Sequence, residues 1–199
     1  MDATNGIEAA LRTSEALQQG HFQLSSGRHS DQYIEKFNLL RQPVLTSQIC
    51  ALIADRFRHQ NVDVVAGPTT GGVILAFEVA RQLGSLAAYA ERSEVGDSKR
   101  EFRRGTTFSH GARVLIVDDI LTTGGSIRET LSALHEEGIE AIGVAVLVDR
   151  SDGAVDIGIP IDALLHMTVA NWEPSDCPLC AAGEPLTKPG TTRIAGRSE

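Results

Sequence analysis

The sequence predicts an α/β protein with a central, mostly parallel sheet flanked by helices and a small N-terminal unit ahead of it. Between Pro43 and Asp149, apolar segments of strand length alternate with amphipathic segments of helix length, which is the pattern of successive βαβ units. Clusters of small and polar residues follow several of the apolar segments. The chain has 199 residues, of which 42% are hydrophobic, so it is able to bury a sizeable core.

The first 41 residues are expected to form the small unit. A helix is predicted over residues 5–19, because Ile7 and Leu11 keep helical spacing and Gly20 is able to end the helix. A polar, extended segment follows over residues 22–33. We find no internal repeat and no low-complexity linker in the sequence.

Residues 42–170 are expected to form the α/β core. In chain order we predict a helix over 44–59, a strand over 62–68, a helix over 71–83, a strand over 85–92, a long loop or hairpin over about 93–111, a strand over 113–119, a helix around 127–134 that Gly138 ends, and a strand over 142–149. Such a succession implies a mostly parallel sheet with helices on both faces. Ligands of these sheets bind beyond the carboxyl ends of the strands.

Composition and charge exclude several classes of protein. The formal charge of −8 argues against a general nucleic-acid binder, although a local cluster of donors could still hold a small anion. No apolar run reaches the roughly 18–20 residues of a membrane span, and the N-terminus has no signal-peptide pattern. Three cysteines (Cys50, Cys177 and Cys180) are too few for a disulfide framework. We therefore expect a cytoplasmic protein that binds no membrane.

The strongest motif lies at the end of an apolar strand. Asp118 and Asp119 follow four apolar residues, and a loop of small residues, 122–126, then opens a helix. Adjacent carboxylates are suited to accept hydrogen bonds from a vicinal diol, and a glycine-rich helix N-terminus suits a phosphate. The combination describes a 5-phosphoribosyl group. The loop lacks the lysine of a nucleoside triphosphatase loop; the plain structural alternative is a strand–turn–helix capped by Ser126.

A second loop, residues 66–72, follows the preceding strand and opens another helix. Alone, a glycine-rich turn of this kind is more often a matter of geometry than of binding. Together with the first motif, it is better interpreted as a second anion site.

The first motif is similar to the phosphoribosyl-pyrophosphate (PRPP) motif of type I phosphoribosyltransferases. The resemblance implies the type I phosphoribosyltransferase fold, with Asp118 and Asp119 on the ribose hydroxyls, the first loop on the 5-phosphate, and an unusual backbone geometry in the second loop that presents N–H groups to the diphosphate. It also implies Mg²⁺ as cofactor, bound mainly through PRPP and otherwise through Asp118 or Asp119. The residues that it implies for PRPP binding are Thr69, Thr70, Gly71, Gly72, Arg92, Asp118, Asp119, Ile120, Leu121, Thr122, Thr123, Gly124, Gly125 and Ser126.

The N-terminal segment indicates the base. The pattern Phe22-x-Leu24-x-Ser26-Gly27-x-x-Ser30-x-x-Tyr33 resembles the hood of orotate phosphoribosyltransferases. Arg150 ends a predicted strand at the position where that family contacts the orotate carboxylate, and a guanidinium is a suitable partner for a planar carboxylate. The resemblance implies an orotate site formed by Ser25, Tyr33, Thr122 and Arg150.

The sequence departs from the family pattern in two places. Ser25 stands where the best-known orotate enzymes have a lysine. Their mobile loop carries an arginine, a catalytic lysine and a histidine, but here only the arginine has a counterpart, Arg92. Lys99, Arg100, Arg103 or Arg104 could supply the missing charge, and the alternative is a solvated basic hairpin. The expected catalytic residues are therefore Asp118, Asp119, Lys99, Arg100 and Arg103.

The tail, residues 171–199, is expected to form a C-terminal arm that covers another part of the protein. Cys177 and Cys180 have the spacing of half a zinc site. The sequence offers no second cysteine pair, and only His166 and Cys50 stand out as loose candidates for further ligands. Structural or solvent-facing thiols are the favoured interpretation.

The resemblance implies an orotate phosphoribosyltransferase of pyrimidine biosynthesis, a pentosyltransferase that converts PRPP and orotate to orotidine 5′-monophosphate and pyrophosphate. It also implies a homodimer with shared active sites. Two alternatives stay open: a phosphoribosyltransferase for another base, and a PRPP-binding regulatory protein without turnover, which the altered mobile loop permits.

Overall fold

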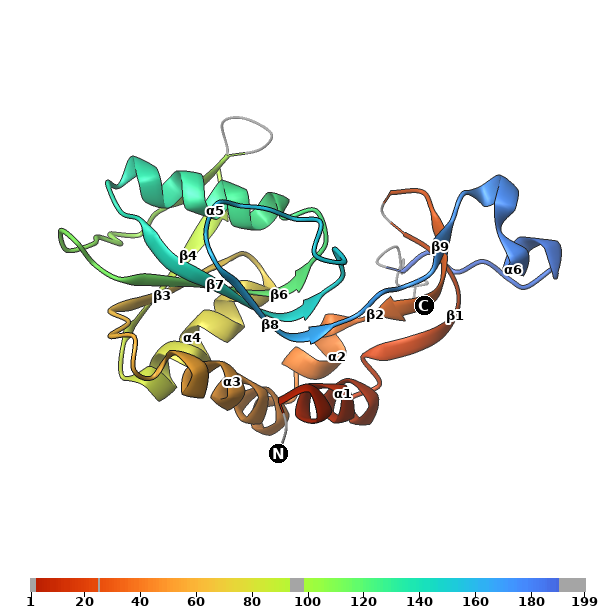
Figure 1. Cartoon of the computed structure of the whole chain (residues 1–199), viewed down its shortest axis with the longest axis horizontal. Helices are drawn as coiled ribbons and strands as arrows, with labels where there is room; N and C mark the ends of the chain where they lie inside the picture. The colour runs from red at the N-terminus through yellow and green to blue at the C-terminus, as the bar shows by residue number, and fades with distance from the viewer. Residues whose placement is uncertain (1–2, 25, 94–98, 190–199) are drawn as a thin grey trace, which may run out of the picture.

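The computed structural model describes residues 3–24, 26–93 and 99–189. Figure 1 shows a larger α/β body joined to a smaller body that contains both the N-terminal hairpin and the C-terminal arm. The elements are α1 (Ala3–Thr13), β1 (Leu17–Gln23), β2 (His29–Ile34), α2 (Lys36–Leu40), α3 (Pro43–Phe57), β3 (Val64–Pro68), α4 (Gly71–Leu83), β4 (Leu86–Arg92), β5 (Arg100–Phe102), β6 (Val114–Leu121), α5 (Gly125–Glu136), β7 (Ala141–Asp149), β8 (Ile161–His166), β9 (Asn171–Trp172), a 3₁₀ turn (Pro174–Asp176) and α6 (Pro178–Ala181).

The larger body is built on a six-stranded sheet with the order β5-β4-β3-β6-β7-β8. Five strands are parallel, and only β5 at the edge runs antiparallel to its neighbour, which confirms the predicted mostly parallel sheet. The chain moves from β3 outward to β4, then returns to place β6 on the other side of β3. The sheet therefore has its topological switch point between β3 and β6, where ligands of such sheets bind.

Helices cover both faces of this sheet. Helices α1, α3 and α4 lie on one face and α5 on the other (Figure 1). Because side chains alternate across a strand, Leu115 and Val117 of β6 enter the core cluster that contains Leu75 of α4. Val114 and Ile116 of the same strand enter the second cluster, on the α5 face. Both faces of the central strands are thus buried, which explains their continuous apolar sequence.

The smaller body is a three-stranded antiparallel sheet in which β2 lies between β1 and β9. β9 belongs to the C-terminal arm, so the arm adds a strand to the N-terminal hairpin. The arm returns a second time, where the amide of Gln23 donates to the carbonyl of Thr187 and the amide of Thr187 donates to the carbonyl of His21, at 2.8 Å each. Segments from opposite ends of the chain therefore form one body.

The N-terminal helix is shorter than predicted. It ends at Thr13, and Leu17 begins a strand that the periodicity had assigned to the helix. Glu15 adopts a left-handed backbone with φ 56°, and the amides of Ser14 and Ala16 close the last turn on Ala10 and Leu11. A non-glycine residue therefore ends the helix before Gly20, which the sequence pattern does not signal.

The long segment after β4 forms a hairpin, one of the two predicted forms. β5 pairs antiparallel with β4, and residues 94–98 lie outside the described part. β8 and β9 lie in segments for which the sequence pattern predicted no strand. The domain boundaries at residues 41 and 170 stay predictions. Within the described ranges, no helix is long and apolar enough to cross a membrane.

Leu115→Ala is expected to lower the free energy of unfolding by about 2–5 kcal/mol, because it deletes a fully buried side chain between the sheet and its helices. Leu86→Ala is the matched control, since Leu86 is 70% exposed and should change stability by less than about 0.5 kcal/mol. Urea unfolding of the two variants measures the difference. Equal losses would contradict the placement of the core.

Candidate active site

The two predicted loops meet at the switch point of the sheet. Loop 69–72 follows β3, and loop 122–126 follows β6, its neighbour. Loop 69–72 lies so close to β6 that a Cβ atom on Gly71 would be 1.8 Å from Oδ2 of Asp119, and the turn itself is so tight that a Cβ atom on Gly67 would be 2.2 Å from the carbonyl oxygen of Gly72. Only glycine fits at these positions. The absence of a side chain on Gly71 lets the backbone of loop 69–72 lie directly against Asp119.

The acid pair is buried at the end of β6. Asp118 is 6% exposed and Asp119 is 3% exposed. Oδ2 of Asp118 accepts a hydrogen bond from the Ser126 hydroxyl at 2.7 Å, and Oδ1 accepts one from the Asp119 amide at 2.9 Å. Ser126 therefore fixes one carboxylate from the first turn of α5.

Asp119 is held by Lys36, a residue that no sequence motif had singled out. The ammonium group of Lys36 lies 2.8–2.9 Å from both carboxylate oxygens of Asp119, and the Ile120 amide donates to Oδ1 at 2.8 Å. Lys36 starts α2, far from the motif in sequence. The one sequence feature that could have indicated Lys36 is its position next to Glu35, just after the hood segment.

Burial and the neighbouring Asp119 charge raise the pKa of Asp118 to about 6, against the lowering effect of the Ser126 hydrogen bond. Two adjacent carboxylates in a desolvated position disfavour full ionisation of both. Asp118 therefore changes charge close to physiological pH.

The loop after β6 has the geometry of an anion site. Gly124 adopts a left-handed backbone with φ 76°, and a Cβ atom there would lie 2.8 Å from Val155. The loop then enters α5 at Gly125, and the first amides of a helix have no partner within it. Arg128 donates to the carbonyl of Thr123 at 2.5 Å. The loop is thus shaped by a glycine and stabilised by an arginine from the helix that it opens.

The second loop is supported from below by Arg100. This side chain is 3% exposed; its guanidinium donates to Oγ1 of Thr69 at 2.9 Å, to the Thr69 carbonyl at 3.3 Å and to Oε2 of Glu129 at 3.0 Å. The peptide bond between Thr69 and Thr70 is cis. Arg100 therefore lies buried beneath the loop and not on a solvent-facing hairpin.

The other basic candidates lie at the surface. Lys99 pairs with Glu136 at 3.0 Å, Arg103 with Glu101 at 2.7 Å and Arg104 with Glu91 at 3.1 Å. Arg92 is exposed at the end of β4. The structure thus separates Arg100 from the remaining cations, and the catalytic roles of Lys99, Arg100 and Arg103 stay predictions.

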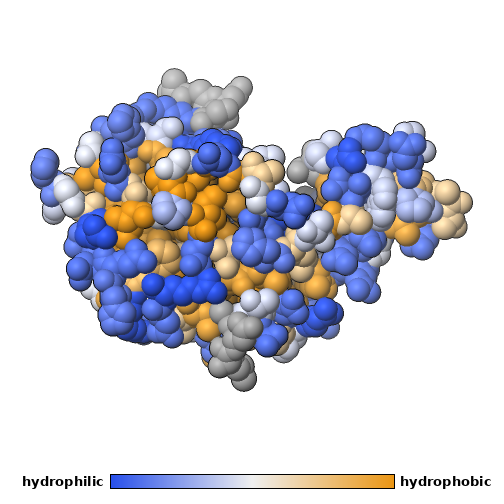
Figure 2. Space-filling view, in the orientation of Figure 1, coloured by the Kyte–Doolittle hydropathy of each residue, from blue (hydrophilic) through white to orange (hydrophobic). Residues whose placement is uncertain are grey.

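A cavity of about 520 Å³ lies between the two bodies and is lined by the start of loop 122–126, Thr122 and Thr123, where the molecular surface is hollowed (Figure 2). Arg150 reaches it from the end of β7. The hood, the motif loop and the arm all contribute: the lining residues are Gln23, Leu24, Ser26, Tyr33, Thr122, Thr123, Arg150, Asn171, Lys188 and Pro189. Three of the four predicted orotate residues therefore come together, and Ser25 lies outside the described residues.

Arg150 is the unusual group of this cavity. Its Nε is buried, and no described group accepts a hydrogen bond from it. Burial lowers the pKa of Arg150, and burial raises the pKa of Tyr33, which faces it. A guanidinium that lines a cavity and has an unpaired donor is suited to pair with an anion.

The acid pair fits a metal that the ligand brings with it. Within the described chain, the carboxylate oxygens already contact Ser126, Lys36 and backbone amides, and they join no cluster of three or more potential metal ligands. Mg²⁺ takes few protein ligands when phosphates supply the rest. Asp118 or Asp119 would thus contribute at most a minor part of its coordination.

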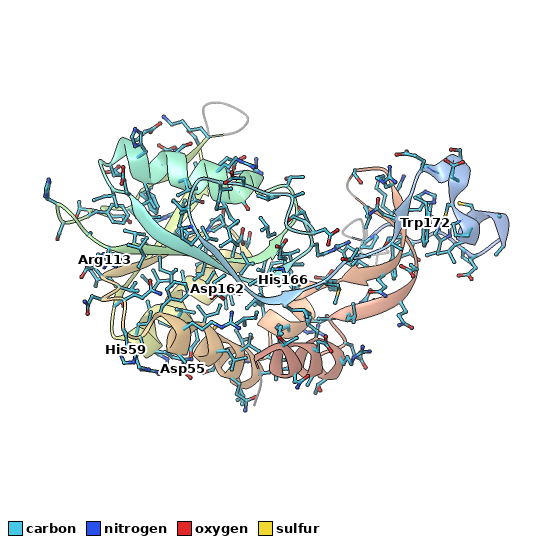
Figure 3. All side chains as sticks on the ribbon, in the orientation of Figure 1. Asp55, His59, Arg113, Asp162, His166 and Trp172 are labelled. Carbon is cyan, nitrogen blue, oxygen red and sulfur yellow. The ribbon has the colours of Figure 1, made fainter. Side chains whose placement is uncertain are left out.

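The Cys-x-x-Cys pair does not lie near either candidate partner. Cys50 is buried in the core cluster around α3, and His166 ends β8 in the larger body, away from Trp172 and the arm (Figure 3). The sulfurs instead face His21 and His29 of the hairpin, so the two partners suggested by the sequence are wrong. Single histidines in a polar segment gave no signal of their own.

Comparison with known proteins agrees with this geometry. The family model of the phosphoribosyl transferase domain matches residues 37–179. Fold and site together therefore define a type I phosphoribosyltransferase.

Individual relatives with high sequence identity narrow the assignment from phosphoribosyltransferases in general to one family. The chain is 43% identical to the orotate phosphoribosyltransferase of Caldanaerobacter subterraneus subsp. tengcongensis over 180 residues, which cover 90% of this chain and 93% of the relative. It is also 43% identical to the orotate phosphoribosyltransferase of Pelotomaculum thermopropionicum, covering 94% and 97%. The chain belongs to the orotate phosphoribosyltransferase family, which confirms the resemblance seen in the sequence.

Solved structures share the fold. Orotate phosphoribosyltransferase from Aeropyrum pernix superposes with a TM-score of 0.71 at 27% identity, covering 81% of this chain and 93% of that chain. Adenine phosphoribosyltransferase from Rhodothermus marinus superposes with a TM-score of 0.62 at 20% identity, covering 80% and 99%. The second likeness concerns the fold alone.

Asp118→Asn is expected to stabilise the protein above pH 6, by up to about 3 kcal/mol at 1.36 kcal/mol per pKa unit, because it removes a buried charge while the Ser126 hydroxyl turns to accept from the new amide. The gain should shrink as the pH falls from about 6 toward 4, where the folded wild-type protein takes up a proton on Asp118 that the unfolded chain does not. Urea unfolding at several pH values measures it.

The control is Asp55→Asn, because Asp55 is a surface carboxylate that is 65% exposed. This variant should show no comparable pH-dependent gain. A pH-independent effect of Asp118→Asn would contradict the raised pKa.

Proposed function

We propose that this protein transfers the 5-phosphoribosyl group of PRPP to orotate and releases pyrophosphate, the step of pyrimidine biosynthesis that gives orotidine 5′-monophosphate. The observation that carries the proposal is the cavity in which Arg150, with its unpaired buried donor, shares the lining with Thr122 and Thr123 of the loop that follows the acid pair on β6. An anionic planar base would use the guanidinium, and the ribose and phosphate joined to it would use the acid pair and the loop.

The acid pair and the motif loop would hold PRPP. Asp118 and Asp119 accept hydrogen bonds from the ribose hydroxyls. Ile120 and Leu121 connect the acid pair to loop 122–126. Residues 122–126 bind the 5-phosphate through amides and hydroxyls at the start of α5. Residues 69–72, with Arg100 beneath them, face the diphosphate. Exposed Arg92 at the end of β4 supplies positive charge on the same side.

Arg150 would hold orotate. Its guanidinium binds the orotate carboxylate in the cavity, and Tyr33 and Thr122 line the same space. Ser25 belongs to the same proposed site. This contact orients the ring nitrogen toward the ribose held by the acid pair. Purine bases carry no carboxylate, so the same arginine disfavours them.

The reaction depends on the positioning of its substrates more than on covalent catalysis by the protein. The bond from ribose C1 to the diphosphate oxygen breaks, positive charge builds up on the ring, and the orotate nitrogen forms the new bond. The carboxylates of Asp118 and Asp119 lie beside that charge and favour it. Mg²⁺, when bound, neutralises the leaving diphosphate. Lys36 orients the carboxylate of Asp119, and Lys99 or Arg103 would add charge when the hairpin closes over the site.

Homodimer formation and a cytoplasmic location are part of the proposal. An apolar groove between α2, α3 and α4 is lined by Leu40, Pro43, Val73, Ile74 and Phe77. Phe77 is 65% exposed and Ile74 is 37% exposed. Exposed apolar patches of this kind mark subunit contacts, and a second copy of the chain is the partner that the family implies.

The transfer reaction is tested by the absorbance of orotate after mixing the purified protein with PRPP, orotate and Mg²⁺. We expect a fall that requires all three and produces equal amounts of orotidine 5′-monophosphate and pyrophosphate. PRPP binding without any fall would contradict the proposal and favour a regulatory protein. Turnover with adenine or another base instead of orotate would assign a different specificity.

Arg150→Ala is expected to raise the KM for orotate by about 100-fold, since a charge-assisted bidentate contact contributes about 1.5–3 kcal/mol. The KM for PRPP should change much less. Arg150→Lys is the matched control, because it keeps the charge but loses the planar guanidinium. Its KM for orotate should lie between those of the wild type and of Arg150→Ala. Equal effects on both substrates would contradict a specific role in holding the orotate carboxylate.

Phe77→Glu is expected to convert a dimer into monomers, because it places a charge in the apolar groove of α3 and α4. Light scattering coupled to size-exclusion chromatography measures the mass. Leu186→Glu, on the arm and 45% exposed, is the control and should leave the mass unchanged. A monomeric wild-type protein would contradict the proposed dimer.

A further inference from the structure

Four potential metal ligands converge in the smaller body, away from the acid pair. His21 lies on β1, His29 on β2, Cys177 directly before α6 and Cys180 within α6. One ligand atom from each lies within 4.8 Å of all the others. Residues from the two ends of the chain thus meet at one point.

The spacing of these atoms matches a tetrahedral shell around a single ion. Zinc bonds of about 2.0–2.1 Å to nitrogen and about 2.3 Å to sulfur give ligand–ligand edges of about 3.3–3.8 Å. Nε2 of His21 lies 3.0 Å from Nδ1 of His29, 3.4 Å from Sγ of Cys177 and 3.7 Å from Sγ of Cys180. Nδ1 of His29 lies 3.3 Å from Sγ of Cys180.

The orientation of His21 fits a metal ligand. Its other nitrogen, Nδ1, lies 2.9 Å from the carbonyl oxygen of Glu184. A carbonyl only accepts hydrogen bonds, so Nδ1 carries the proton and Nε2 presents a lone pair to the cluster. Histidine ligands of metals characteristically donate their second N–H to such an outer acceptor.

Ordinary hydrogen bonds do not account for the cluster. The lone pair of Nε2 accepts one hydrogen bond well, yet a nitrogen and two sulfurs crowd around it. His21, His29 and Cys177 are each less than 5% exposed, so bulk water does not supply the missing hydrogen bonds. A cation at the centre satisfies all four lone pairs at once.

We propose that His21, His29, Cys177 and Cys180 bind a structural zinc ion. Thiolate and imidazole ligands in a closed tetrahedron favour zinc over magnesium or calcium, which prefer oxygen. Each thiol loses its proton on binding, so the two thiolates balance the charge of Zn²⁺ and the closed site is neutral.

The arm needs such a link because it has almost no core of its own. Among its described residues, 171–189, Cys177 is the single one that is buried. Its other contacts with the hairpin include the short β9 pairing, the bridge at Thr187, the contact of His21 with the Glu184 carbonyl, and the contacts of Arg28 with Asn171 and Glu173. Small units with little apolar burial are commonly held by a metal.

A zinc staple at this point would also shape the base cavity. Asn171, Lys188 and Pro189 of the arm line the cavity that contains Arg150, and the four ligands tie the arm to the hairpin that supplies its opposite wall. This consequence rests on the proposed function, whereas the metal site does not.

The first test is the metal content of the purified full-length protein, measured by inductively coupled plasma mass spectrometry. We expect about one zinc per chain. After removal of metal with a chelator, Co²⁺ is titrated into the wild-type protein, and its absorption reports the ligands. Thiolate-to-cobalt charge transfer with intense tetrahedral d–d bands is expected. A metal-free protein whose chelator-treated form gives no such bands would overturn the proposal.

Cys180→Ser tests the ligand set in a variant whose changed side chain is exposed. We expect zinc affinity to fall by more than the about 10–100-fold that loss of an outer partner costs, with weaker charge transfer. Cys50→Ala and His59→Gln, outside the cluster, should bind zinc as the wild type does. Equal zinc affinity of Cys180→Ser and wild type would overturn the assignment.

Activity separates this proposal from the proposed function. Removal of zinc should raise the KM for orotate more than the KM for PRPP. If zinc binds as predicted but the protein does not consume orotate, the transferase proposal fails and the metal site stands. If the protein turns over orotate without binding zinc or Co²⁺, the metal site fails alone.

Discussion

Two carboxylates buried side by side at the end of β6 are the constraint on which the site depends. Burial and the neighbouring charge of Asp119 raise the pKa of Asp118, and the surrounding groups offset the cost: Ser126 and the Asp119 amide hold Asp118 in place, and Lys36 neutralises Asp119. Gly71 must lack a side chain because Asp119 occupies the space. Loop, helix start and lysine are therefore arranged around one pair of carboxylates.

The second constraint is the joining of the chain ends in the smaller body. The hairpin supplies one wall of the base cavity, and the arm supplies another. Neither has a large apolar core, so polar pairing and the proposed zinc site stabilise their contact. The base cavity thus depends on an element about 150 residues away from the hairpin, while the phosphoribosyl side depends on adjacent parallel strands. The cavity around Arg150 is thus built from both bodies, whereas the acid pair and its loops lie in the larger body alone.

The sequence predicted what local patterns determine. The parallel core, the acid pair, both glycine loops and Arg150 all follow from apolar strands that end in chemically distinctive residues. It did not predict the early end of the first helix, because the left-handed Glu15 is not a usual helix stop. It missed Lys36, His21 and His29, since each acquires its partner only through tertiary packing. It grouped Arg100 with surface cations, whereas the pairing of β5 with β4 buries it beneath Thr69.

The most direct test of the account is a crystal structure of the protein with orotidine 5′-monophosphate. We predict the base carboxylate on the guanidinium of Arg150, the ribose hydroxyls on Asp118 and Asp119, and the phosphate on the amides and hydroxyls of residues 122–126. A nucleotide bound with its phosphate at Arg150, or with its ribose away from the acid pair, would contradict the central claim that these three groups form one substrate site.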